Sequence, residues 1–243
     1  MKRAFDVGLS ACGLLLLSPV LFVALLLVWL QDRRSPLYIA PRVGLHGRMF
    51  HMYKIRSMVV GADRTGVEST GAADIRITRI GAFVRRWKLD EIPQLWNVLR
   101  GQMSLVGPRP NTAGEVENYT PDQRSLLAVR PGITDIASIV FADEGEILRH
   151  ASDPDEAYRE IIWPWKSRLG QFYVSRRSVA LDFLLIALTA FAAIDRQRVL
   201  QILAAQLRKM GAPEDLVRAA AREAPLVSGS VGSRSPHGGG GKS

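Results

Sequence analysis

Two adjacent carboxylates, Asp90 and Glu91, are the residues of this chain best suited to chemistry. They stand near the start of the stretch KLDEIPQLWNVLRGQMSLVGPRP, which covers residues 88–110. Neighbouring side chains on a helix point about 100° apart, so two acids in a row cannot share one task symmetrically. One acid could attack an electrophile while the other assists or holds a cation. Alternatively, Asp90 could simply cap the helix that follows.

A helix and a rigid turn come after the acids. Pro93 stands where the first helical turn tolerates proline, and apolar residues at helical spacing predict a helix that ends at Gly101. An apolar, strand-like piece then leads into Gly107-Pro108-Arg109-Pro110. The sequence therefore predicts a turn that presents one guanidinium, that of Arg109, between Pro108 and Pro110.

This stretch resembles the signature of bacterial sugar transferases, the monotopic phosphoglycosyl transferases that start polysaccharide assembly on polyprenyl phosphate. Their pattern is Leu-Asp-Glu-(Leu/Ile)-Pro-Gln-(Leu/Phe)-(Trp/Phe)-Asn, followed by Met-Ser-(Leu/Phe)-Val-Gly-Pro-Arg-Pro. The chain matches it almost letter for letter, and the resemblance extends over about residues 1–195. It favours the acid pair as catalysts rather than caps.

The resemblance also implies a reaction. Asp90 would attack the β-phosphate of a UDP-sugar, release UMP and carry a phosphosugar, which undecaprenyl phosphate would then accept. Glu91 and Asp90 would bind Mg²⁺. Such a reaction initiates exopolysaccharide, O-antigen, capsule or glycoconjugate assembly, so downstream glycosyltransferases and a second copy of the chain (a homodimer) are candidate partners.

Residues 50–58 alternate as in a strand, with Lys54 and Arg56 on one side. On this pattern alone they could form a solvated strand face. The segment is similar to the family's Phe-x-x-Tyr-Lys-(Phe/Ile)-Arg-(Ser/Thr)-Met, which makes both cations expected ligands of substrate phosphate.

Two further arginines lie in family segments. Arg79 falls within the Thr-Arg-(Ile/Val)-Gly run, and Arg130 within Val-Arg-Pro-Gly-Ile-Thr. The resemblance assigns both to substrate binding, together with Arg109 and its flanking prolines. Arg85 or Arg86 would instead touch lipid headgroups.

Two alternative functions stay open. Asp153-Pro-Asp155 fits the Asp-x-Asp metal motif, which would make the protein a metal-dependent, membrane-associated glycosyltransferase that releases UDP. A non-catalytic membrane adaptor is the other alternative. The sugar is not predicted, because the chain departs from the family pattern at Asp135-Ile-Ala-Ser138.

The amino-terminal segment predicts a membrane helix. Lys2 and Arg3 precede an almost uncharged run from Val7 to Leu30, which as a helix would measure about 36 Å, against roughly 30 Å for a hydrocarbon core. Ser18-Pro19 lies at its midpoint, and positive charge flanks both ends. These features leave a kinked spanning helix and a helix that enters and returns both open. The resemblance favours a re-entrant helix broken at Ser18 and Pro19, with Lys2, Arg3 and this break at the lipid headgroups.

We therefore expect a mixed, helix-rich α/β monotopic protein at the cytoplasmic face of the bacterial inner membrane. Trp163-Pro-Trp165 is typical of an interfacial position. The predicted parts are a re-entrant helix (1–36), a catalytic domain (37–175), an interfacial apolar helix (176–195), amphipathic helices (196–226) and a disordered tail (227–243).

Composition narrows the partners. The chain of 243 residues carries a net charge of +9, which indicates a polyanionic partner. Nucleic acid is not expected, because no nucleic-acid-reading motif is present. Cys12 is the only cysteine, so no disulfide can form within the chain, and the four histidines show no metal-ligand spacing.

Overall fold

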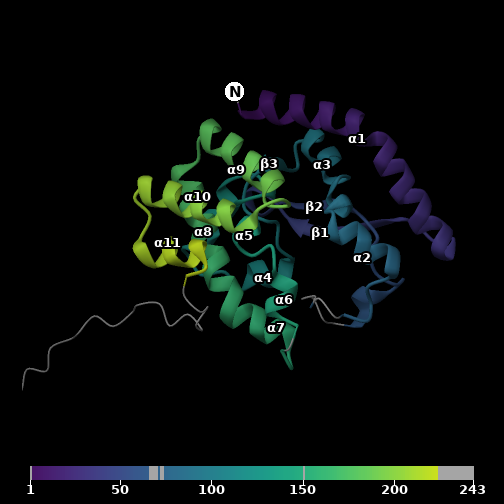
Figure 1. Ribbon diagram of the computed structural model, residues 1–243. Helices are drawn as coiled ribbons and strands as arrows, with labels where there is room; N and C mark the ends of the chain where they lie inside the picture. The colour runs from purple at the N-terminus through teal and green to yellow at the C-terminus, as the bar shows by residue number, and fades with distance from the viewer. Residues whose placement is uncertain (1, 66–70, 72–73, 150, 224–243) are drawn as a thin grey trace, which may run out of the picture.

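The computed structural model describes residues 2–65, 71, 74–149 and 151–223. Helices gather around two small sheets, and one long helix, α1 (Lys2–Asp32), lies along one side (Figure 1). The prediction of a mixed, helix-rich α/β fold is confirmed. The predicted tail (227–243) lies outside the described residues, as does part of residues 61–73, a polar, glycine-rich stretch that the sequence predicts to be a loop.

Helix α1 is continuous through Ser18 and Pro19, although proline removes one backbone donor. The Ser18 hydroxyl donates a hydrogen bond of 2.8 Å to the carbonyl of Leu15. Figure 1 shows α1 changing direction partway along its length, from a path over α3 and α9 to one beside α2. Among the described helices, only α1 is long and apolar enough to cross a membrane. The predicted break is thus a bend in one helix, and the return within a bilayer stays a prediction.

Two small sheets carry the segments that matter for the site. Strands β1 (Leu37–Val43) and β2 (Met49–Ile55) form an antiparallel hairpin with Leu37 opposite Ile55. Strands β3 (Ser104–Val106) and β4 (Gly132–Thr134) are parallel, with Ser104 opposite Gly132. A Cβ at Gly132 would lie 2.1 Å from the backbone nitrogen of Gly107, so the turn after β3 crosses β4 at a distance that only glycine permits.

Of the other described helices, which are mostly short, α2, α3 and α4 lie between strands in the chain, and the rest follow β4. These helices are α2 (Arg79–Arg86), α3 (Gln94–Leu99), α4 (Ala113–Glu117), α5 (Ile136–Val140), α6 (Glu144–Ile147), α7 (Pro154–Ala157), α8 (Trp163–Arg176), α9 (Val179–Phe191), α10 (Arg196–Lys209) and α11 (Glu214–Ala221). Single turns of other helical types are η1 (Leu45–Gly47), η2 (Ala62–Thr65), η3 (Leu89–Glu91), η4 (Gln123–Ala128) and the π-helical η5 (Tyr158–Ile162).

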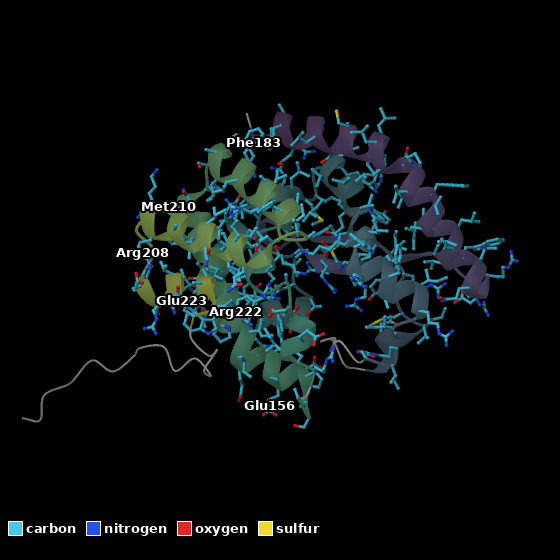
Figure 2. All side chains as sticks on the ribbon, in the orientation of Figure 1. Glu156, Phe183, Arg208, Met210, Arg222 and Glu223 are labelled. Atoms are coloured by element: carbon cyan, nitrogen blue, oxygen red, sulfur yellow. The ribbon has the colours of Figure 1, made fainter. Side chains whose placement is uncertain are left out.

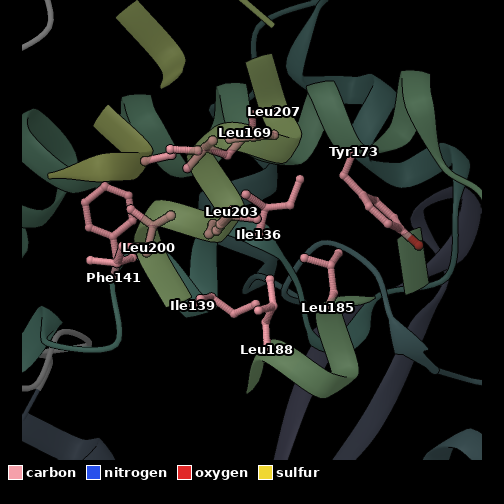
Figure 3. Close-up of a cluster of buried hydrophobic side chains, with 14 of the residues drawn as sticks. Ile136, Ile139, Phe141, Leu169, Tyr173, Leu185, Leu188, Leu200, Leu203 and Leu207 are labelled. Carbon is pink, nitrogen blue, oxygen red and sulfur yellow. The ribbon is translucent and has the colours of Figure 1, made fainter. Parts of the chain in front are cut away.

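The main hydrophobic core lies between α5, α8, α9 and α10 (Figure 3). Fully buried residues from each helix meet there, among them Ile136, Leu169, Leu185 and Leu203. Burying such a side chain contributes roughly 1.5–3 kcal/mol. Helix α9, which lies in the region predicted to rest at the interface, therefore packs on the domain, although its Phe183 is exposed.

Several aromatic residues lie where the sequence did not place them. The helical spacing of Phe83, Val84 and Trp87 in the sequence predicts a shared core face, but only Val84 is buried, and Phe83 and Trp87 are exposed. Trp163, expected at the membrane interface, instead stacks on Tyr119 with ring centroids 5.5 Å apart. Its position is therefore explained by packing within the domain.

Candidate active site

The acid pair lies in a 3-10 turn directly before α3. Lys88 adopts a left-handed conformation (φ 52°) and turns the chain into η3, which contains both Asp90 and Glu91. No side chain caps η3 or α3, and the Asp90 carboxylate accepts no backbone hydrogen bond within the described part of the chain. Capping therefore does not explain Asp90.

Two cations, Lys54 and Arg109, surround the acids. The Lys54 ammonium lies 3.9 Å from an Asp90 carboxylate oxygen and 3.8 Å from one of Glu91. Arg109 donates a hydrogen bond of 3.0 Å to the same Glu91 oxygen. The side chains of Lys54, Asp90 and Glu91 are only 13–18% exposed, whereas that of Arg109 is 44% exposed. The site therefore combines a sheltered acid pair with a guanidinium that solvent, and hence a substrate, can reach.

A buried amide holds this arrangement together. The Asn97 side chain on α3 donates to the carbonyl of His51 (2.6 Å) and accepts from the backbone N–H of Tyr53 (3.0 Å) on β2. It also donates to the side chain of Gln102 (2.8 Å). These bonds fix α3, which follows the acids, against the strand that carries Lys54.

The turn that carries Arg109 is fixed from two sides. The Gly107 N–H donates to the carbonyl of Thr134 (3.0 Å), and the Gly132 N–H donates to the carbonyl of Pro108 (3.0 Å). A Cβ at Gly170 of α8 would lie 3.8 Å from that of Pro108, so the proline rests on α8. Pro108 thus has a packing role, as expected for a rigid turn.

The surroundings separate the two acids electrostatically. Burial raises the pKa of Asp90 above its ordinary value, and Lys54 offsets only part of this effect. Burial also acts to raise the pKa of Glu91, but the positive charges of Arg109 and Lys54 outweigh it and hold that pKa below its usual range. Glu91 in turn raises the pKa of Arg109. Glu91 is therefore the acid with a hydrogen-bonded guanidinium, and the Asp90 carboxylate has no such partner among the described residues.

Arg85 is a further candidate for the site, because its charge affects the acid pair. It was expected at lipid headgroups, yet its charge acts directly on Asp90 and on Lys54. Burial lowers the pKa of Arg85, while Asp90 acts in the opposite direction. Arg85 is half-buried on α2, whereas Arg86 is exposed.

Three other predicted cations lie elsewhere. Arg56 comes after the last residue of β2 and forms a two-point ion pair with Asp32 (2.6 and 2.7 Å). Arg79 is exposed at the start of α2. Arg130 donates to the carbonyl of Gly101 (2.8 Å). The structure therefore gives Arg56 and Arg130 structural bonds and does not bring them to the acid pair.

The predicted headgroup contacts at the amino terminus are also replaced by protein contacts. The Lys2 ammonium forms an ion pair with the buried carboxylate of Asp182 and donates to the carbonyl of Val106 (3.2 Å). Arg3 donates to the carbonyl of Leu99 (3.0 Å), at the end of α3. Both cations thus have partners within the protein, a buried acid and an unpaired helix end.

The acid pair is suited to a cation such as Mg²⁺, which takes one or two carboxylates and completes its shell with substrate phosphates. Over the residues that the structure describes, no group of three or more potential metal ligands is found. The rival Asp-x-Asp motif is otherwise engaged, because Asp153 caps α7 by accepting from the N–H groups of Asp155 and Glu156 (2.9 and 3.0 Å). Asp90 and Glu91 thus fit the metal better.

The chain thus combines a sheltered acid pair, with Lys54 and Arg109 beside it, and one apolar helix long enough to cross a membrane. The chain belongs to the bacterial sugar transferase family, whose model matches residues 1–196. The match includes α1, the acid pair and Arg109.

Curated relatives agree with this assignment. The chain is 38% identical over 199 residues to an undecaprenyl-phosphate glucose phosphotransferase of Komagataeibacter xylinus, covering 77% of this chain and 35% of that protein. It is 31% identical over 189 residues to a UDP-N-acetylgalactosamine-undecaprenyl-phosphate N-acetylgalactosaminephosphotransferase of Aeromonas hydrophila, covering 76% and 42%. It is 37% identical over 204 residues to the exopolysaccharide production protein PSS of Rhizobium leguminosarum bv. phaseoli, covering 81% and 96%. The chain thus spans less than half of the first two proteins.

Proposed function

We propose that this protein transfers a sugar 1-phosphate from a UDP-sugar to undecaprenyl phosphate and releases UMP. The observation that carries the proposal is the sheltered Asp90–Glu91 pair with Lys54 and Arg109 around it. The names of two relatives specify undecaprenyl phosphate and a sugar phosphotransferase activity, which supports the same chemistry.

In this proposal Asp90 is the nucleophile. A carboxylate oxygen of Asp90 forms a bond to the β-phosphorus, and the bond from that phosphorus to the bridging oxygen breaks, with its electron pair leaving on UMP. An oxygen of undecaprenyl phosphate then attacks the same phosphorus. The carboxylate of Asp90 is thereby regenerated, and the product is undecaprenyl-diphosphate-sugar.

Lys54, Arg85 and Arg109 would stabilise the negative charge on the phosphates, because preorganised cations act strongly in a sheltered site. The Arg109 side chain is 44% exposed, compared with 18% for that of Lys54, and is thus suited to receive the diphosphate. Glu91 would orient Arg109. Mg²⁺ held by Asp90 and Glu91 would supply further charge neutralisation.

The apolar helix α1 would bring the protein to its acceptor, because undecaprenyl phosphate is a lipid that lies in the membrane. We propose that α1 enters the cytoplasmic side of the bacterial inner membrane and returns at its bend, so that the catalytic domain meets cytoplasmic UDP-sugar and membrane-borne acceptor together. The exposed apolar residues of α1, with Phe83 and Trp87 on α2, support a lipid-facing surface. Polysaccharide synthesis would begin with the product.

The test uses purified protein in lipid nanodiscs with undecaprenyl phosphate, Mg²⁺ and a panel of UDP-sugars. We expect UMP from one or more donors, ping-pong kinetics and a phosphosugar adduct on Asp90 by mass spectrometry. Asp90→Asn should lose UMP release, whereas Glu117→Gln, an exposed acid on α4, should retain it. Release of UDP, or full activity in Asp90→Asn, would refute the proposal.

A further inference from the structure

A second charged pair lies outside the acid pair. The Lys166 ammonium on α8 forms an ion pair with the carboxylate of Glu144 on α6. The Lys166 side chain is 12% exposed and that of Glu144 is 28% exposed, and the ammonium lies 5.0 Å from the ring centroid of Tyr158. Ions this sheltered lose much of their hydration, so the pair adds little to stability relative to apolar residues. A role in binding would account for it better.

The pair faces the side of the site that carries Arg109. Lys166 lies one helical turn before Gly170, on the same face of α8, and Gly170 is the residue that packs on Pro108. Electrostatics agree, because Glu144 adds to the rise in the pKa of Arg109. The Glu144–Lys166 pair is therefore beside the guanidinium that we assign to the diphosphate.

Two arginines hold helix α6 in position through the residue that precedes it. Asp143, which precedes Glu144, accepts hydrogen bonds from Arg196 (2.7 Å) and from Arg222 (3.2 Å). Arg196 also donates to the carbonyl of Val140 (3.0 Å). Figure 2 labels Arg222 near the carboxyl end of α11, outside the family match. Two arginines thus fix a four-residue helix that would have little stability of its own.

We propose that Glu144 and Lys166 recognise the sugar of the donor, with the ring of Tyr158 beside them. This inference rests on the proposed function. A sugar hydroxyl both donates and accepts, so it can donate to the carboxylate while a neighbouring hydroxyl accepts from the ammonium. The pair has no net charge, which favours a neutral sugar with adjacent hydroxyl groups over a uronic acid. Residues of α6 and α8 thus determine which sugar binds. Arg196 of α10 and Arg222, which follows α11, hold α6 in position through Asp143.

The test compares binding of UDP-sugars with binding of UDP, which shares the diphosphate and lacks the sugar. Calorimetry on the full chain in nanodiscs first identifies the UDP-sugar that the wild type prefers over UDP. Glu144→Gln should reduce this preference at least about tenfold, because the sugar hydroxyl loses its charged acceptor and Lys166 loses its partner, with the affinity for UDP unchanged. Lys166→Met should act in the same direction.

Glu146→Gln is the matched control, since Glu146 lies on the same short helix but is exposed and pairs with Arg149 at the surface. It should leave the preference unchanged. Glu144→Asp, which keeps the charge and shortens the side chain, should retain more of the preference than Glu144→Gln, and it serves as the readout if the glutamine variant does not fold.

Two results would overturn the inference: an unchanged preference in Glu144→Gln and Lys166→Met, or an equal loss of affinity for UDP and UDP-sugar. The latter would mean that the pair only positions Arg109. A wild type that binds a UDP-sugar but releases no UMP from it would refute the proposed function and still leave the binding comparison decisive.

Discussion

Replacing Lys2 by methionine should destabilise the protein, because it leaves the carboxylate of Asp182 buried without its counter-charge. Asp182 is 1% exposed and, within the described part of the chain, its carboxylate would keep only the hydrogen bond from the Tyr173 hydroxyl (2.6 Å). Removing one partner of a buried ion pair costs about 3–5 kcal/mol. Because Lys2 itself is 35% exposed and Tyr173 remains, we expect about 2–3 kcal/mol here. For a chain of this length that corresponds to a fall in Tm of about 4–12 °C.

Thermal unfolding in one detergent, followed by circular dichroism, measures the effect. Lys209→Met is the matched control, since Lys209 is exposed on α10 and should change Tm little. Lys2→Met combined with Asp182→Asn should recover most of the loss, because the stranded charge is then removed; the double-mutant cycle gives the coupling energy. A fall no larger than that of Lys209→Met would refute the buried pair and favour a Lys2 side chain that binds lipid headgroups.

Three further predictions concern the site and its supports. Lys54→Met should lower kcat by about 10²-fold or more, as does the loss of one preorganised charge, while Lys54→Arg retains part of the activity; equal rates for wild type and methionine variant would contradict the assigned role. Asp135→Asn should raise Tm at neutral pH. Burial raises the folded-state pKa of Asp135 above its unfolded value, so its stabilising contribution is present at low pH and is lost as pH rises through the folded pKa. Asparagine can still cap α5, so the gain in Tm should disappear in acid, and a gain that is independent of pH would disprove this reasoning. Gly81→Ala should destabilise the protein and reduce turnover, because a Cβ there would lie 1.8 Å from the carbonyl oxygen of Ser57 and would push α2 away. Gly114→Ala should be tolerated, since a Cβ at this position meets nothing within 4 Å. Similar Tm values for the two variants would contradict the close approach of Gly81 to Ser57.

The sequence predicts the acid pair, Lys54 and Arg109 correctly as neighbours, because all four lie in contiguous motifs that match the family. It also groups Arg56 with Lys54, whereas the structure pairs Arg56 with Asp32. The alternation that places Lys54 and Arg56 on one side holds only within a strand, and β2 ends at Ile55. The chain then turns, and Arg56 meets Asp32 at the end of α1, a partner that no local pattern could indicate.

The same limit applies to residues that meet only in the folded protein. Glu144 and Lys166, which we propose bind the sugar, lie on separate helices, α6 and α8, and only the tertiary packing brings them together. Arg85 and Arg86 are adjacent residues of the same type, and only the packing of α2 makes Arg85 the more buried of the two. Periodicity predicts helices well, but it does not say whether an apolar face such as that of Phe83 and Trp87 meets a core or a membrane.

Helix α1 is fastened to the domain at both ends, by Lys2 on Asp182 and by Asp32 on Arg56, while its middle is exposed. The second fastening lies two residues from Lys54. With α1 in a bilayer as proposed, these two contacts would hold the active site at a fixed distance from the membrane surface. The phosphate of the carrier lipid would then have to move out of the bilayer to reach Asp90 and Glu91. The thickness of the bilayer would therefore affect the reaction rate.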